Sequence, residues 1–142
     1  MERGRAREKE AGKEFLRSLT SNARLIIAVP SRDRRGRPLP RRTRLQTQGV
    51  IEAAMLDACG GATTLRGVGL WRNESGEVVR ERIVVVISYL PDLVSPAQVE
   101  AVRRCILHMF TAANQESIFA VVNERPFLVR PSDASGANEQ AA

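Results

Sequence analysis

The sequence predicts an α+β domain in which two helices cover one face of a four-stranded antiparallel sheet. Short β-branched runs indicate strands, and two longer segments repeat apolar residues at helical spacing. These elements follow one another as strand, helix, strand, strand, helix and strand. The length of 142 residues suits one domain with tails, and only 4% of the residues are aromatic. We therefore expect a single core built from aliphatic side chains.

The first half of the expected domain contains a strand, an arginine-rich loop and a helix. Residues 24–29 form a short apolar run that stops at a proline, which is typical of a buried strand. Residues 32–44 contain a glycine, two prolines and seven arginines, so we expect an exposed loop. Residues 42–59 place apolar side chains at helical spacing. The glycine pair at 60–61 should end this helix in left-handed geometry.

A β-hairpin should follow the first helix. Residues 63–72 and 78–89 have strand composition, and the loop Asn73–Gly76 between them ends in a glycine that suits a positive φ. The second of these strands is apolar on both faces near its middle. We therefore expect it to be central in the sheet.

The second helix has the clearest start signal in the chain. Ser95 can cap the helix, a proline follows in the first turn, and Gln98 completes a capping box. The apolar stripe runs to about Asn114, and residues 118–122 form the last main strand. Residues 127–129 have the composition of a further short strand.

Two right-handed crossovers on one face of an antiparallel sheet give the ferredoxin-like βαββαβ arrangement. This arrangement leaves the second face of the sheet uncovered. Because such sheets often pair face to face or edge to edge, we expect a homodimer. The fold hosts many unrelated functions and therefore names none.

The chain divides by composition into three parts. Residues 1–20 form a charged N-terminal extension, residues 21–131 form the domain, and residues 132–142 form a small, polar tail that we expect to be disordered. No apolar run approaches the roughly 18–20 residues that span a membrane. The first residues also lack the apolar region of a secretory signal. We therefore expect a cytoplasmic protein with no membrane contact.

The charge is distributed unevenly along the chain. Residues 1–50 carry 14 Lys and Arg against 5 Asp and Glu, a net charge of +9, whereas the remainder carries 8 against 11, a net charge of −3. Within the loop at 32–44, the candidate polyanion-binding residues are Arg32, Arg34, Arg35, Arg37, Arg41, Arg42 and Arg44. Arginine donates paired hydrogen bonds to phosphate. A loop whose arginines are merely solvated is the alternative interpretation.

The segment GGATTLRGVGLW at residues 60–71 holds four glycines and the only tryptophan. A dinucleotide-binding fingerprint needs its glycines between a strand and the helix that follows. Here they follow a helix and continue into a strand. The pattern therefore favours a helix stop followed by a strand whose glycines leave room for Trp71.

A second candidate site lies near this segment. Arg66, Trp71 and Glu81 could line a small-molecule pocket, with Glu81 half-buried and paired to Arg66 or Arg72, or acting as a base. The only histidine, His108, lies on the polar side of the second helix. No nucleophile context and no metal-ligand spacing is present, so we predict no catalytic residue, metal site or cofactor.

Part of the chain resembles a bacterial family of small proteins of unknown function. The shared pattern comprises a glycine pair and threonine, a glycine with tryptophan, a turn glycine, a strand glutamate and a glutamine before the last strand. These positions are Gly60, Gly61, Thr63, Gly69, Trp71, Gly76, Glu81 and the turn Gln115–Ser117. The resemblance covers less than half of the chain and implies the fold without supplying an activity. The arginine-rich segment lies outside it.

The leading hypothesis is a non-enzymatic module whose arginine-rich third contacts DNA, RNA or another polyanion. No aromatic residue interleaves the arginines to stack bases, so contact should be to the phosphate backbone. Two alternatives stay open. One is a small-molecule binder or enzyme that uses the cleft near residues 60–81, and the other is a subunit whose arginines meet an acidic protein.

Overall fold

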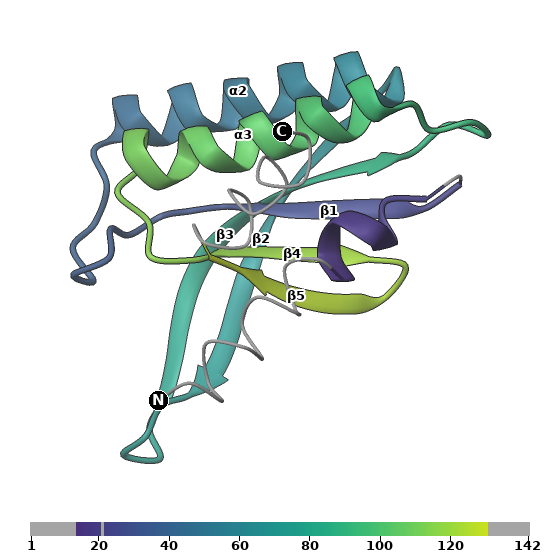
Figure 1. Ribbon diagram of the computed structural model, residues 1–142. Helices are drawn as coiled ribbons and strands as arrows, with labels where there is room; N and C mark the ends of the chain where they lie inside the picture. The colour runs from purple at the N-terminus through teal and green to yellow at the C-terminus, as the bar shows by residue number, and fades with distance from the viewer. Residues whose placement is uncertain (1–13, 21, 131–142) are drawn as a thin grey trace, which may run out of the picture.

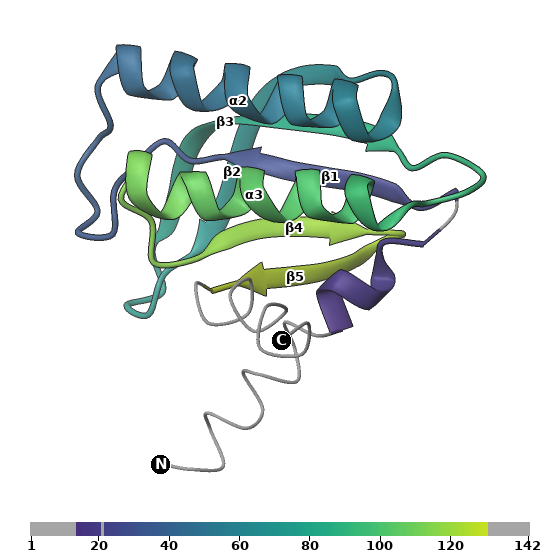
Figure 2. The same ribbon diagram turned by 45° about the horizontal axis from the view of Figure 1, so that its top comes forward.

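The computed structural model describes residues 14–20 and 22–130 and consists of one sheet with helices on one face (Figures 1 and 2). The sheet is five-stranded and antiparallel, in the order β2-β3-β1-β4-β5. Two long helices, α2 and α3, lie side by side across it. The elements are β1 (Arg24–Val29), α2 (Arg41–Cys59), β2 (Thr63–Arg72), β3 (Val78–Tyr89), α3 (Pro96–Ala112), β4 (Ile118–Val122) and β5 (Arg125–Val129).

The α+β class and the antiparallel sheet are confirmed, but the prediction of four strands is wrong. The fifth strand, β5, pairs with β4 along its whole length. The turn between them holds Asn123 and Glu124 at φ values of 47° and 69°. Two consecutive positive φ values are characteristic of the type I′ hairpin turn. Residues 127–129 had the composition of a further short strand, but glutamate is an uncommon residue for that turn geometry, so the strand's start at Arg125 and its pairing with β4 were not predicted. Pro126 is compatible with its place at the edge of the sheet.

The core lies between the sheet and the helices. β1 turns Leu25, Ile27 and Val29 toward the helices, and β4 does the same with alternate residues, as the two-residue period of a strand requires. α2 buries a stripe of four residues spaced by three or four positions: Thr47, Ile51, Met55 and Ala58. The buried Thr47 hydroxyl donates to the Thr43 carbonyl, which satisfies its hydrogen bond inside the core.

The predicted boundary between extension and domain at residue 20 is wrong. Residues 14–18 are helical, and Phe15 and Leu19 are 1% and 4% exposed. The Phe15 ring meets the Phe127 ring of β5 edge-on, with 5.4 Å between centroids. This short helix lies beside β4 and β5 (Figure 2), so it covers apolar side chains at the end of the sheet that the fifth strand adds. Residues 1–13 and the predicted tail at 132–142 lie outside the described residues.

The predicted helix and turn boundaries are confirmed at three positions. Gly60 has a φ of 79° and donates its amide to Leu56, which ends α2. Ser95 and Gln98 form both hydrogen bonds of the capping box at the start of α3. Gly76 closes the β2–β3 loop with a φ of 84°.

The β2–β3 hairpin extends beyond the rest of the sheet (Figure 1). β1 pairs with β3 only over residues 84–89, so residues 78–83 of β3 have β2 as their single neighbouring strand. Within this hairpin arm (residues 67–72 and 78–83), a Cβ on Gly69 would lie 3.2 Å from Ile83 Cγ2 and 3.8 Å from Trp71 Cζ3. Gly69 therefore leaves the space in which the Trp71 ring lies.

The face of the sheet opposite α2 and α3 carries a set of exposed apolar side chains. By strand alternation and register, this face includes Leu65, Trp71, Ile83, Phe119 and Leu128, each of which is more than one-third exposed. An apolar surface of this kind is characteristic of contact sites. The expected homodimer stays a prediction.

Neither cysteine forms a disulfide. Burial raises the pKa of the Cys105 thiol to about 12, and it also raises the pKa of Cys59. Among the described residues, no helix has the length and hydropathy needed to cross a membrane.

Gly69→Ala is expected to destabilise the fold relative to Gly67→Ala. The new methyl group at 69 would meet Ile83 at 3.2 Å, whereas at 67 the nearest side-chain atom is at an ordinary 3.8 Å. The two variants should differ by about 1 kcal/mol in free energy of unfolding, measured by urea denaturation. Equal stabilities would contradict the tight contact between Gly69 and Ile83.

Glu100 should contribute stability that acid removes. Its hydrogen bonds from Arg103 lower the pKa of Glu100 from 4.5 to about 2, with Oε2 2.7 Å from Arg103 Nε. The contribution is present above pH 4.5 and is lost as the pH falls toward 2. Urea midpoints of the wild type and of Glu100→Gln should therefore converge over this interval. A difference between the two urea midpoints that stays constant with pH would show that the ionisation of Glu100 does not contribute to stability.

Candidate functional site

The first part of the arginine-rich segment is a closed turn. Ser31 to Leu39, named here the Arg turn, folds back on itself through an isolated bridge between Arg32 and Pro38. The Leu39 amide donates to the Ser31 carbonyl at 2.9 Å, and the Gly36 amide donates to the Asp33 carbonyl at 2.9 Å. Gly36 has a φ of 77°, which glycine adopts without strain. The backbone of this segment is therefore fixed although its side chains are exposed.

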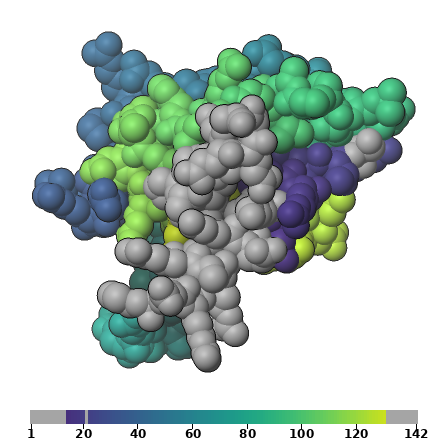
Figure 3. Space-filling model, in the orientation of Figure 1, coloured from purple at the N-terminus to yellow at the C-terminus, as the bar shows by residue number. Residues whose placement is uncertain are grey.

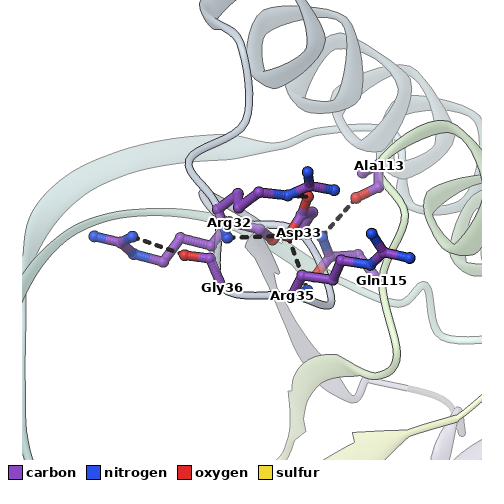
Figure 4. A network of polar contacts seen from close by, with 7 residues as sticks. Arg32, Asp33, Arg35, Gly36, Ala113 and Gln115 are labelled. Atoms are coloured by element: carbon purple, nitrogen blue, oxygen red, sulfur yellow. Dashed lines mark hydrogen bonds and ion pairs between the residues drawn. The ribbon is translucent and has the colours of Figure 1, made fainter.

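The Asp33 carboxylate organises the Arg turn (Figure 4). Its Oδ1 accepts the backbone amides of Arg35 at 2.8 Å and of Arg37 at 3.0 Å. Its Oδ2 lies 3.1 Å from Nε of Arg37. The hydrogen bond from the Arg37 amide, with further help from Arg35, lowers the pKa of Asp33 below its ordinary value. Arg37 is thus partly neutralised by the turn itself.

The Arg turn is also attached to the connection between α3 and β4. The Arg34 amide donates to the Asn114 carbonyl at 2.8 Å. Gln115 Nε2 donates to the carbonyls of Arg32 and Ala113, both at 2.7 Å, as Figure 4 shows. Sequence reasoning noted Gln115 only as part of a resemblance. The sequence signal for this contact was the position of Gln115 just before β4, the strand that pairs with β1.

Glu81 pairs differently from expectation. It accepts a hydrogen bond from the Ser31 hydroxyl, and its Oε1 lies 3.5 Å from Arg32 Nε. The expected partners on β2 were wrong because of the strand register. Glu81 stands opposite Gly69, which has no side chain, whereas Arg66 and Arg72 are on the other face of that strand.

The segment expected as one loop over 32–44 is divided in two. α2 begins at Arg41, so Arg41, Arg42 and Arg44 lie in its first turn. Pro40 precedes the helix, and its carbonyl accepts the Arg44 amide. Arginine is a good helix former, which explains why the helix begins before the apolar stripe. Because a helix N-terminus is positive, these arginines are electrostatically unfavourable there.

A pocket of about 250 Å³ opens between the first half of α2 and the β2–β3 hairpin. Four arginines line it, two from α2 and two from the hairpin. The full lining, named here the Arg pocket, is Val29, Pro30, Ser31, Arg41, Arg44, Leu45, Gln48, Arg66, Gly67, Arg82, Ile83 and Val84. The Arg turn and the start of α2, both blue, project from the same end of the molecule (Figure 3).

Only one of the three residues predicted to share a pocket lines this one. Arg66 does so, whereas Glu81 and Trp71 alternate onto the other face of their strands. Sequence reasoning missed Arg82 as a companion of Arg66. The signal was available in the register, because Arg66 pairs with Val84 and Arg82 lies two positions along β3 on the same face.

The seven arginines of the segment differ in their partners. Arg32 and Arg37 form ion pairs with Glu81 and Asp33, at 3.5 Å and 3.1 Å. Within residues 14–20 and 22–130, the side chains of the other five form no ion pair or hydrogen bond. These five are Arg34, Arg35, Arg41, Arg42 and Arg44. The side chains of Arg66 and Arg82 in the hairpin likewise have no such partner in this part of the chain.

The described residues give little support to a metal site or to a reactive histidine or cysteine. No group of three or more His, Cys, Asp or Glu side chains in that part of the chain could hold a metal ion. His108 is exposed on α3. The raised pKa of Cys105, about 12, keeps its thiol protonated and unreactive at neutral pH.

No protein-family model matches the chain, and no curated protein matches it. Two solved structures of a phage SAM lyase resemble it. The complex with S-methyl-5'-thioadenosine is 17% identical with a TM-score of 0.48, covering 77% of this chain and 85% of the lyase. The apo form is 16% identical with a TM-score of 0.42, covering 78% and 85%. Values this low do not transfer the activity or the ligand to this chain.

Asp33→Ala is expected to loosen the Arg turn without unfolding the domain. The backbone amides of Arg35 and Arg37 should exchange their hydrogens at least about tenfold faster, because both lose a charged acceptor. Hydrogen-exchange NMR measures this. Asp92→Ala is the matched control, since Asp92 is exposed and lies outside the turn. Unchanged exchange in the Asp33 variant would show that the carboxylate does not hold the turn.

Proposed function

We propose that the protein binds polyanions, in the first place the phosphate backbone of nucleic acid, through a basic face. This face consists of the Arg turn and the first turn of α2. The observation that carries the proposal is that five of its seven arginines have no side-chain partner within the described residues, as established above. Elsewhere in the structure, Arg24 and Arg104 pair with glutamates. Arg17 and Arg80 also form no ion pair, counting only the residues that the structure describes, but five unpaired arginines within one short segment are a concentration of free positive charge.

Geometry adds a second argument. The Arg turn is held by Asp33 and by Gln115, so its arginines extend from a fixed backbone. Fixing the backbone in advance lowers the entropy that binding has to overcome. Guanidinium groups donate to phosphate in pairs, and each neutralised phosphate releases counterions. The basic face therefore suits an extended anion better than a small neutral molecule.

Binding of this kind would be independent of base sequence. No Phe, Tyr or Trp occurs in residues 31–44, so this stretch offers no stacking platform for bases. Contacts to phosphates position a protein on nucleic acid without specifying a sequence. An acidic protein surface is the competing partner, and it would give salt-sensitive binding to protein with none to nucleic acid.

We also propose that the domain has the ferredoxin-like arrangement, extended by one strand. The order β2-β3-β1-β4 and the two helices on one face support it. β5 then adds an edge strand beside β4. In this interpretation the basic face lies at the end of the sheet where β1 leads into the Arg turn.

The proposal predicts salt-dependent binding to a mixed-sequence DNA duplex, measured by fluorescence anisotropy between about 50 and 200 mM salt. The triple variant Arg34→Gln, Arg35→Gln and Arg42→Gln should bind more weakly. Its slope of log affinity against log salt should flatten by about 0.9 for each lost phosphate contact.

The matched control removes the same charge elsewhere, with Arg17→Gln, Arg24→Gln and Arg104→Gln. This control should keep most of the affinity and the slope, because these residues lie outside the basic face. Absence of DNA binding by the wild type at about 50 mM salt would contradict the proposal, since several phosphate contacts are strong at that concentration. Equal losses in both triple variants would contradict the assignment to this face.

A further inference from the structure

The Arg pocket joins two parts of the chain that the sequence keeps apart. Arg41 and Arg44 come from the first turn of α2, and Arg66 and Arg82 come from facing strands of the hairpin. Between them the pocket has a volume of about 250 Å³, just below the roughly 300–1,000 Å³ of sites for drug-sized ligands. The space therefore suits a small ligand contacted from two walls.

The charge of this pocket is uncompensated. Its lining contains four arginines and no acidic residue. None of the four side chains has an ion pair or hydrogen bond in the part of the chain that the structure describes. Glu81 does not neutralise them, since it is held by Ser31 and Arg32. Four like charges around one small space repel each other, and an anion between them would turn this repulsion into attraction.

The rest of the lining strengthens that attraction. Val29, Leu45 and Val84 form an apolar part of the wall. Apolar walls lower the local dielectric constant, so charged hydrogen bonds in the pocket are stronger than on an open surface. Val84 packs against the core cluster, which anchors this wall to the body of the domain.

The number and placement of the arginines select the ligand chemistry. A carboxylate can satisfy one guanidinium through its two oxygens. Four guanidinium groups on two opposing walls need several oxygens and several negative charges spread along the ligand. We propose that the Arg pocket binds a chain of two or more phosphate groups, with Arg41 and Arg44 contacting one side and Arg66 and Arg82 the other. The proposal rests on the polyanion-binding function proposed above and names a ligand for it.

Titration calorimetry with orthophosphate, pyrophosphate and tripolyphosphate tests the chemistry directly. Affinity should rise at least about tenfold from orthophosphate to tripolyphosphate, because more guanidinium groups find an oxygen. Equal affinities for the three anions, or no binding of tripolyphosphate, would overturn the proposal.

Paired variants test the location. Arg66→Gln with Arg82→Gln should lower the affinity for tripolyphosphate at least about tenfold. Arg17→Gln with Arg104→Gln removes the same charge elsewhere and should leave that affinity within about twofold, because neither residue lines the pocket or belongs to the basic face. Circular dichroism verifies that both variants are folded. Equal losses in the two variants would place the anion outside the Arg pocket and overturn the proposal.

Two sources could supply such a phosphate chain, namely a free small molecule and the 5′ end of a nucleic acid. Single strands with a 5′-triphosphate and with a 5′-hydroxyl distinguish them. A tighter complex with the triphosphate strand, lost in the Arg66 and Arg82 variant, supports the nucleic-acid end. If the protein binds both strands with equal affinity and tripolyphosphate displaces neither strand, the Arg pocket is not part of the nucleic-acid site.

The two proposals can fail separately. DNA binding without tripolyphosphate binding overturns the Arg pocket and leaves the basic face standing. Tripolyphosphate binding that depends on Arg66 and Arg82, without DNA binding, supports the pocket and overturns the nucleic-acid function. Absence of both overturns both.

Discussion

The structure depends on β1, which is paired antiparallel with β3 on one side and with β4 on the other. This double pairing places the end of β1 beside two other segments. One is the connection that leads into β4, and the other is the point where β3 continues into the hairpin arm. The Arg turn follows β1 directly, so Gln115 holds it from one side and Glu81 from the other. The candidate site is thus a consequence of the strand order.

The electrostatics of the domain are uneven between the candidate site and the rest of the structure. Away from the site, several arginines are matched by acids, as Arg125 is by Glu14 at 2.6 Å and Arg103 is by Glu100. Arg17 and Arg80, however, form no ion pair with any residue that the structure describes. At the site, unpaired arginines gather at a helix N-terminus and around one pocket. Such an arrangement lowers stability through like-charge repulsion and an unfavourable helix dipole. Local departures from stabilising rules are expected at functional sites.

Local patterns predicted most of the secondary structure because each pattern had a local physical cause. The long strands β2 and β3 and the capping box at Ser95 follow from composition and hydrogen-bonding side chains alone. The short strand expected at residues 127–129 begins earlier, at Arg125, because its turn uses Glu124 at a positive φ that the residue type does not announce. Phe15 was missed as a core residue because its burial depends on Phe127, which is 112 positions later in the chain. No local pattern reports such a distant contact.

By itself, the sequence determined the α+β class, the order of the elements and the concentration of positive charge before residue 50. The tertiary structure alone decided which charges act together. The strand register placed Glu81 opposite Gly69 and on the other face from Arg66. Arg66 and Arg82 instead share a pocket with the first turn of α2. The reason is physical. Periodicity gives the face on which a side chain lies, whereas the meeting of two faces depends on long-range packing that only the folded chain establishes.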